Sequence, residues 1–121
     1  MRALLLVSHG SRRAQSNEEV NQLCERLGLD MKHQFDMVHS AFLEIASPSI
    51  PEGIEQCIQE GASSITVLPY FLAMGRHVAE DIPSIVAEAG EKYPEVSISI
   101  TRHIGASEGM LKLISSLTGN S

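Results

Sequence analysis

The sequence predicts an α/β fold of three layers, in which helices cover both faces of a four-stranded parallel sheet. Short apolar runs alternate with longer amphipathic segments in the order βαβαβαβα. This alternation is typical of parallel strands joined by right-handed helical crossovers. The 121 residues contain no linker, repeat or low-complexity segment, and 43% of them are hydrophobic. We therefore expect a single packed domain over residues 1–121.

The first two elements follow from an apolar run and an amphipathic stretch. The continuous run Ala3–Ser8 is typical of a strand that is buried on both faces. Ser16 or Asn17 is expected to cap a helix that runs to about Leu27, because apolar residues recur there at spacings of three and four. Gly28 is expected to close this helix.

The middle of the chain predicts two further strands with a helix between them. The stretch Phe35–Ile45 is rich in β-branched and aromatic residues, which indicates a second strand. A turn at residues 47–49 is expected to start a helix that ends at Gly61. The run Ser64–Leu68 predicts the third strand, and Pro69 fits the end of a strand better than its middle.

The last third of the chain predicts a loop, a helix, a strand and a final helix. Residues 70–76 are expected to form an apolar loop. The following helix is expected over residues 77–92, with Pro83 as a kink or a restart. The alternating residues 96–101 predict the fourth strand, and residues 105–117 predict the last helix.

Composition and charge exclude several classes of function. A net charge of −6 argues against a general binder of nucleic acid or of an anionic membrane. The longest apolar stretch near the N-terminus, Ala3–Val7, is too short for a signal peptide or a membrane span, so we expect a cytoplasmic protein. Cys24 and Cys57 form no CxxC pair and are expected to be buried free thiols. The chain has neither a Walker loop nor a GxGxxG motif, so no organic cofactor is expected.

Potential metal ligands follow several of the predicted strands. His9 follows the first strand, Glu44 lies at the end of the second and His103 follows the fourth, while the apolar loop leads to His77. Ligands of parallel α/β sheets bind at the carboxyl ends of the strands, where these residues are expected to converge. Imidazole and carboxylate together suit Co²⁺, Ni²⁺, Fe²⁺ or Zn²⁺. Each histidine taken alone is more often structural, so the site hypothesis depends on the convergence. The remaining histidines, His33 and His39, are expected to be structural or surface residues.

Arginines and apolar residues surround the same predicted edge. Arg12, Arg13 and Arg102 also follow strands, which indicates a positive rim for an anionic ligand, or else arginines that are merely solvated. The loop Tyr70–Met74 is unusually apolar for a connection. It is expected to form either a hydrophobic wall for a large planar ligand or a contact with the core or with another subunit.

Three sequence pieces resemble a known family. They are LLLVSHGSR near the start, AFLE at residues 41–44 and LPYFLAMGRHVAEDIP at residues 68–83. Together they are similar to the small sirohydrochlorin chelatases of the cobalt, nickel and siroheme pathways. The resemblance extends from one end of the chain to the other. The third piece is the most specific, because it joins a strand end, an apolar loop and a histidine in fixed order.

The resemblance implies a chelatase-like fold and a homodimer that holds the macrocycle between its two halves. It implies that His9 is a metal ligand and the proton acceptor, and that His77 is the second metal ligand. It also implies that several residues contact the tetrapyrrole, namely Glu44, Phe71, Leu72, Ala73, Met74, Gly75 and Arg76.

The resulting hypothesis is the insertion of a divalent metal into sirohydrochlorin or a related tetrapyrrole. The metal is a substrate, with Co²⁺ the first expectation and Ni²⁺ or Fe²⁺ the alternatives. A metal-binding or metal-delivery protein that uses the same histidines without catalysis is the alternative function. A histidine phosphatase is disfavoured, because such a site needs an arginine directly before its histidine and Ser8 precedes His9.

Overall fold

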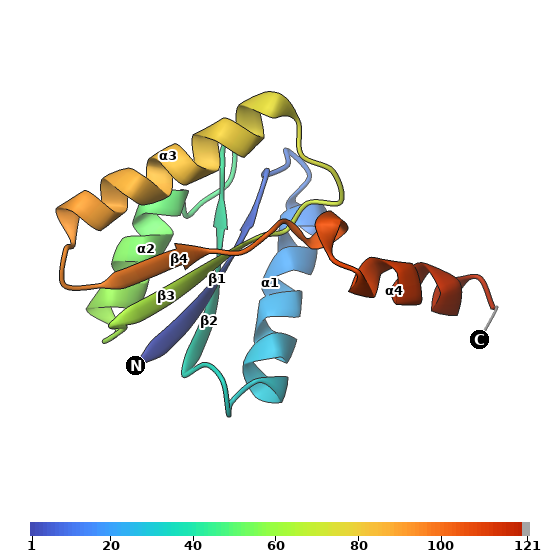
Figure 1. Cartoon of the computed structure of the whole chain (residues 1–121), viewed down its shortest axis with the longest axis horizontal. Helices are drawn as coiled ribbons and strands as arrows, with labels where there is room; N and C mark the ends of the chain where they lie inside the picture. Colours follow the sequence, from blue (N-terminus) through green and yellow to red (C-terminus); the bar gives the residue numbers. More distant parts are fainter. Residues whose placement is uncertain (120–121) are drawn as a thin grey trace.

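The computed structural model describes residues 1–119 as alternating strands and helices (Figure 1). Its elements, in chain order, are β1 (Arg2–Ser8), α1 (Ala14–Asp30), β2 (Met37–Phe42), α2 (Ile50–Gln59), β3 (Ser64–Pro69), α3 (Arg76–Lys92), β4 (Ser97–Ile100), the 3₁₀-helix η1 (Ile104–Ala106) and α4 (Gly109–Leu117). The four strands are all parallel, in the order β2-β1-β3-β4. The predicted α/β fold with a four-stranded parallel sheet is thereby confirmed.

Two apolar clusters hold the helices on the two faces of the sheet. On one face, Leu5 and Val7 of β1 pack with residues of α2 and α3, including Ile54 and Ile82. On the other face, Leu4 and Leu6 pack with residues of α1, including Cys24. The alternation of Leu4 to Val7 between the two faces follows from the period of two in a β-strand. Burial of both faces explains why the β1 sequence is apolar throughout.

Helix α2 begins as the sequence predicts. Ser49 and Glu52 form a capping box, in which the Ser49 hydroxyl accepts from the Glu52 amide and Glu52 Oε1 accepts from the Ser49 amide at 2.8 Å. These hydrogen bonds hold the pKa of Glu52 below its usual range. Gly53 in the next turn faces the sheet, and a Cβ there would lie 2.8 Å from the Ala41 Cβ. The missing side chain therefore lets α2 approach β2 closely.

Helix α1 is longer at both ends than the sequence predicts. It begins at Ala14, with Arg13 at its N-cap, rather than at Ser16 or Asn17. The Asn17 side chain instead bonds the backbone amide and carbonyl of Ser11, at 2.9 and 2.8 Å, and closes the preceding loop. Gly28 does not end the helix. It lies opposite Val38 of β2, so tertiary packing overrides its low helix propensity.

Three other predicted boundaries were wrong. Strand β2 ends at Phe42, because the chain turns there toward α2. By contrast, Gly61 closes α2 as predicted: it follows the C-cap residue Glu60 with a φ of +107°, and its amide donates to the Ile58 carbonyl at 3.0 Å. Helix α3 continues through Pro83 without a restart, because that side chain is exposed and the carbonyl it leaves unpaired can bond to water. The last predicted helix is divided into η1 and α4.

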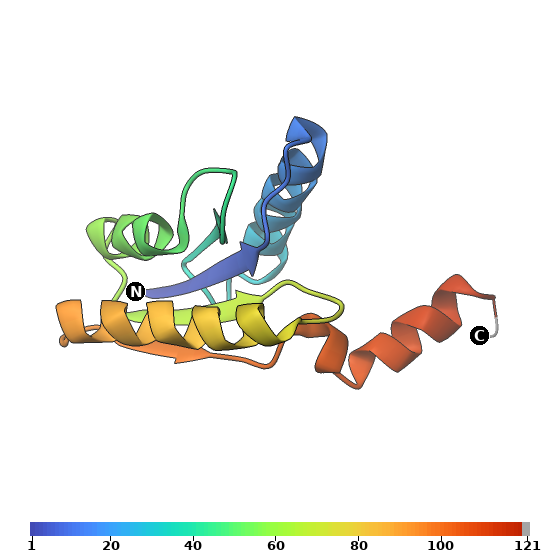
Figure 2. The same cartoon turned by 90° about the horizontal axis from the view of Figure 1, so that it is seen from above.

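Helix α4 stands apart from the rest of the fold. In both views it projects away from the sheet (Figures 1 and 2). Among the described elements it packs mainly against η1. The second face of the sheet is therefore covered by α1 alone among the described α-helices. No described helix is both long and apolar enough to cross a membrane.

Both cysteines are free, buried thiols, as the sequence predicts. Burial raises the pKa of Cys24 to about 11. Burial, with a further contribution from the negative charge of Glu60, raises the pKa of Cys57 to about 12. Each thiol therefore stays neutral in the folded protein over a range in which an unfolded cysteine ionises.

Two measurements should show this burial. At pH 8 we expect a thiol reagent to modify neither cysteine in the native protein and both after denaturation. The raised pKa values give stability that is complete below the ordinary value of 9.0 and is lost as the pH rises through 11 and 12. The melting temperature should fall across this range, less steeply in Cys24→Ala. Rapid native labelling at pH 8 would contradict the prediction.

Candidate functional site

His9 and Glu44 meet at the carboxyl end of the sheet. Pairing of β1 with β2 continues past both strands, because the Leu43 amide donates to the Ser8 carbonyl and the Glu44 amide donates to the His9 carbonyl, at 2.9 and 3.0 Å. Their side chains are in contact, with 3.2 Å between His9 Nε2 and Glu44 Oε1. The predicted convergence of these two residues is thus present in the structure.

Two unusual backbone conformations hold this pair. Gly10 has a φ of +98°, and a Cβ there would lie only 1.9 Å from the Glu44 carbonyl oxygen. Ile45 has a φ of +71°, a left-handed conformation that β-branched residues rarely adopt. It brings the Ala46 amide within 2.8 Å of the Glu44 carbonyl. The chain therefore turns sharply directly after Glu44 and packs against Gly10.

Each ring nitrogen of His9 faces an oxygen atom. Nδ1 lies 3.3 Å from the Gly10 carbonyl, and Nε2 faces the Glu44 carboxylate. A protonated imidazole can donate to both oxygens at once, whereas a neutral one has a single N–H. The side chains of His9 and Glu44 are 50% and 58% exposed, so a ligand and solvent can reach the pair.

His77 lies in the first turn of α3 and is exposed to solvent. Gly75 provides the N-cap of α3 without a side-chain hydrogen bond, so no side chain covers the helix start. The neighbouring Arg76 lies near Glu80 one turn further along α3, with 3.7 Å between Arg76 Nε and Glu80 Oε1. Across residues 1–119, no cluster of three or more His, Cys, Asp or Glu side chains is arranged to hold a metal ion. The role of His77 as a ligand stays a prediction.

The apolar loop after β3 divides into buried and exposed residues. Phe71 and Met74 are half-buried and pack against the core, whereas Leu72 is 73% exposed. Gly105 of η1 holds this loop: its amide donates to the Phe71 carbonyl at 2.9 Å, and a Cβ on it would lie 1.7 Å from the Leu72 carbonyl oxygen. Phe71 and Met74 thus contact the core, whereas Leu72 presents an exposed apolar surface.

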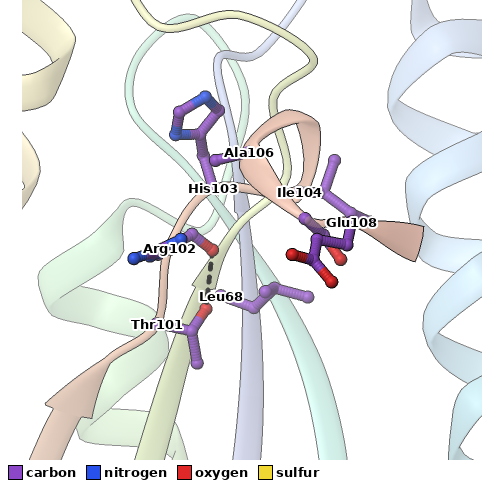
Figure 3. A pocket seen from close by; sticks show the side chains of 8 residues that line it. Leu68, Thr101, Arg102, His103, Ile104, Ala106 and Glu108 are labelled. Atoms are coloured by element: carbon purple, nitrogen blue, oxygen red, sulfur yellow. Dashed lines mark hydrogen bonds between the residues drawn. The ribbon is translucent and has the colours of Figure 1, made fainter. Parts of the chain in front are cut away.

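The arginines expected to form a positive rim occupy two places. Arg12 and Arg13 are exposed at the start of α1, where Arg13 also donates to the Gln15 side chain at 3.1 Å. Arg102 lines a cavity of about 530 Å³ beside η1, with Glu108 on the opposite side (Figure 3). His103 also lines this cavity, whereas His9 and Glu44 do not. The rim role of these arginines stays a prediction.

The histidines expected to be structural lie away from this edge. His33 is exposed in the turn between α1 and β2. His39 of β2 pairs with Glu60, with 2.8 Å between His39 Nε2 and Glu60 Oε1. This hydrogen bond lowers the pKa of Glu60. Both positions agree with the sequence-based expectation.

The sequence gives no sign of two residues that shape the site. Nothing in the stretch Glu44-Ile45-Ala46 indicates a left-handed isoleucine, because isoleucine disfavours that conformation. Gly105 lies in a region predicted as helix, where a glycine has no obvious purpose. Only its close contact with the Leu72 carbonyl shows why no side chain fits there.

Comparison with known proteins covers almost the whole chain. The CbiX family model matches residues 3–120. A chloroplastic sirohydrochlorin ferrochelatase of Arabidopsis thaliana is 36% identical over 115 residues, which are 92% of this chain and 48% of that protein. A sirohydrochlorin cobaltochelatase of Sulfolobus acidocaldarius is 33% identical over 114 residues, which are 94% of this chain and 87% of that protein.

The fold also matches solved structures. The sirohydrochlorin chelatase SirB from Bacillus subtilis subspecies spizizenii, in complex with cobalt, aligns with a TM-score of 0.83 and 31% identity over 98% of this chain and 50% of SirB. This chain spans about half or less of the length of several proteins it matches. The family model matches nearly every residue, and one relative of similar length is 33% identical. The chain belongs to the CbiX family.

Proposed function

We propose that this protein inserts a divalent metal ion into sirohydrochlorin or a closely related tetrapyrrole. The observation that carries the proposal is the His9–Glu44 pair, with 3.2 Å between Nε2 and Oε1 on an accessible surface at the carboxyl end of the sheet. Support comes from the family, whose matched members include sirohydrochlorin ferrochelatases and cobaltochelatases. An imidazole beside a carboxylate supplies both needs of the reaction, a metal ligand and a proton acceptor.

The reaction exchanges two protons for one metal ion. The macrocycle loses two pyrrole N–H protons as its nitrogens bind M²⁺, so the site must deliver the metal and accept the protons. His9 takes one of the two protons at Nε2, and Glu44 stabilises the resulting imidazolium at 3.2 Å, while the second proton leaves to solvent water. Metal-bound imidazole is a poor base, so His9 releases the metal as it accepts a proton, or shares proton transfer with Glu44. His77 holds the metal as the auxiliary ligand.

The surrounding residues would hold the macrocycle. Exposed Leu72 and its neighbours in residues 71–76 present carbon surface to a planar ligand. Arg12, Arg13 and Arg102 would bind peripheral carboxylates, whose binding energy can be used to bend the ring toward the metal. Because His9, Glu44 and His77 lie on an accessible surface, we propose that a second copy of the chain covers the other side of the macrocycle.

Co²⁺ stays the first expectation for the metal, with Ni²⁺ and Fe²⁺ as alternatives. Imidazole and carboxylate accept all three ions, and geometry and availability decide among them. The matched relatives include both iron and cobalt enzymes, so family membership does not choose between these two. The cytoplasmic location expected from the sequence also stays a prediction.

The test is a spectroscopic assay of the purified chain. Sirohydrochlorin is mixed with Co²⁺, Ni²⁺ or Fe²⁺, with and without protein, and the visible spectrum is followed under anaerobic conditions. We expect acceleration over the protein-free reaction with at least one metal, and its loss on adding a chelator. No acceleration with any metal would overturn the proposal. A titration that shows metal binding without macrocycle binding would favour a metal-delivery protein instead.

A further inference from the structure

Among the described helices only α1 covers one face of the sheet, so part of that face is open, although a parallel sheet is normally covered on both faces. Side chains between α1 and β3 form an apolar groove of about 330 Å³ on this face. Its lining residues include Leu23, Leu27, Phe35, Thr66, Leu68 and Ile104. In a three-layer fold this place belongs to a second helix beside α1.

Helix α4 has the surface that such a groove needs. Met110, Leu113, Ile114 and Leu117 share one side of the helix, at spacings of three and four. Leu113, Ile114 and Leu117 are 50%, 52% and 77% exposed, and Leu111 beside them is 72% exposed. These side chains leave several hundred Å² of carbon uncovered, which in a soluble protein indicates a contact surface. The chain thus exposes an apolar helix and an apolar groove.

The connection to α4 directs the helix away from its own groove. Gly105 is fixed against the loop after β3 by its hydrogen bond to the Phe71 carbonyl and by its contact with Leu72. The next residues are also bonded in sequence: the Ser107 amide donates to the Ile104 carbonyl, and the Met110 amide donates to the Ser107 carbonyl, both at 3.1 Å. Both views show α4 leaving the molecule from this point (Figures 1 and 2). Folding back would require these contacts to break.

We propose that two copies of the chain exchange α4, so that the helix of each copy lies in the apolar groove of the other. A reciprocal exchange forms two such contacts. Each contact covers the exposed apolar side chains of one α4 and one groove of about 330 Å³. This inference assigns a surface to the homodimer proposed above, and its test needs neither metal nor tetrapyrrole.

The test measures the molar mass of the full chain by light scattering after gel filtration, over a wide range of concentration. The wild type is expected at twice the chain mass of 13.1 kDa. The double substitution Leu113→Glu and Ile114→Glu on the helix should give monomers, and so should Thr66→Glu in the groove. The matched controls Lys112→Glu, on the polar side of α4, and Thr66→Val should remain dimers. Circular dichroism checks that each variant is folded.

A mixing experiment separates exchange from other dimers. The helix variant keeps an intact groove, and the Thr66→Glu variant keeps an intact helix. Mixed in equal amounts at high concentration, they should recover a dimer, because one intact helix–groove contact remains in each mixed pair. A monomeric wild type, a dimer that survives either glutamate variant, or a mixture that stays monomeric would overturn the exchange. A monomeric wild type would also overturn the second copy proposed over the macrocycle. Metal insertion is measured in a separate assay, so failure of the exchange is distinct from failure of the proposed reaction.

Discussion

Replacing His9 with alanine is expected to reduce the rate of metal insertion by two orders of magnitude or more. The substitution removes the proposed proton acceptor and one metal ligand, and general-base catalysis alone contributes about 10²–10⁴-fold. The Glu44 carboxylate, 3.2 Å from the imidazole, stays in place and can accept some of the protons. Initial rates with sirohydrochlorin and Co²⁺, followed by the visible spectrum, give the comparison.

Two further variants separate the roles of the histidines. His77→Ala should raise the KM for the metal more than it lowers kcat, because the auxiliary ligand binds the ion without accepting protons. The matched control is His33→Ala, which removes an exposed histidine from the turn between α1 and β2 and should leave the rate unchanged. Wild-type rates in both His9→Ala and His77→Ala would refute the site assignment while leaving the family membership intact.

Gly10→Ala is expected to cause a large loss of stability at the site. The new Cβ would lie 1.9 Å from the Glu44 carbonyl oxygen, and the φ of +98° is itself unfavourable for alanine. Overpacking and a left-handed conformation together cost about 2–4 kcal/mol. The urea midpoint of unfolding should fall accordingly, and the displaced residues 43–46 should separate Glu44 from His9.

Gly90→Ala is the matched control for this substitution. Gly90 lies inside α3, and a Cβ there meets nothing within 4 Å. Because alanine favours a helix more than glycine does, the urea midpoint should rise, by up to about 1 kcal/mol in stability. Equal midpoints for Gly10→Ala and the wild type would show that the turn after Glu44 can move without cost, contrary to the structure.

Much of the fold could be predicted because the signals for it are local. The stretch Ala3–Ser8 is almost entirely apolar because both faces of this strand are buried. Helix α2 begins at a capping box between Ser49 and Glu52, which are only three residues apart. Gly28 misleads because its effect depends on β2, ten residues further along the chain. Helix α4 has a clear amphipathic pattern, but the pattern does not say which groove its apolar side faces.

The site could be predicted only where the sheet itself fixes positions. His9 and Glu44 meet because parallel strands bring their carboxyl ends together, and the register of β1 with β2 then aligns the two residues. His77 follows an irregular loop, whose path depends on the contact between Gly105 and Leu72 and not on a repeating pattern. Sequence periodicity therefore cannot place His77 relative to the other two residues.

The left-handed conformation of Ile45 lowers the stability of the protein, and another residue at this position could recover that stability. An L-residue in this conformation costs roughly 1–2 kcal/mol relative to glycine, and Ile45 bears that cost directly beside the His9–Glu44 pair. Selection for heat resistance alone would favour glycine or asparagine at this position. Selection for turnover would retain the isoleucine if its stiffness keeps Glu44 in place. Selection for stability and selection for activity would therefore favour different residues at position 45.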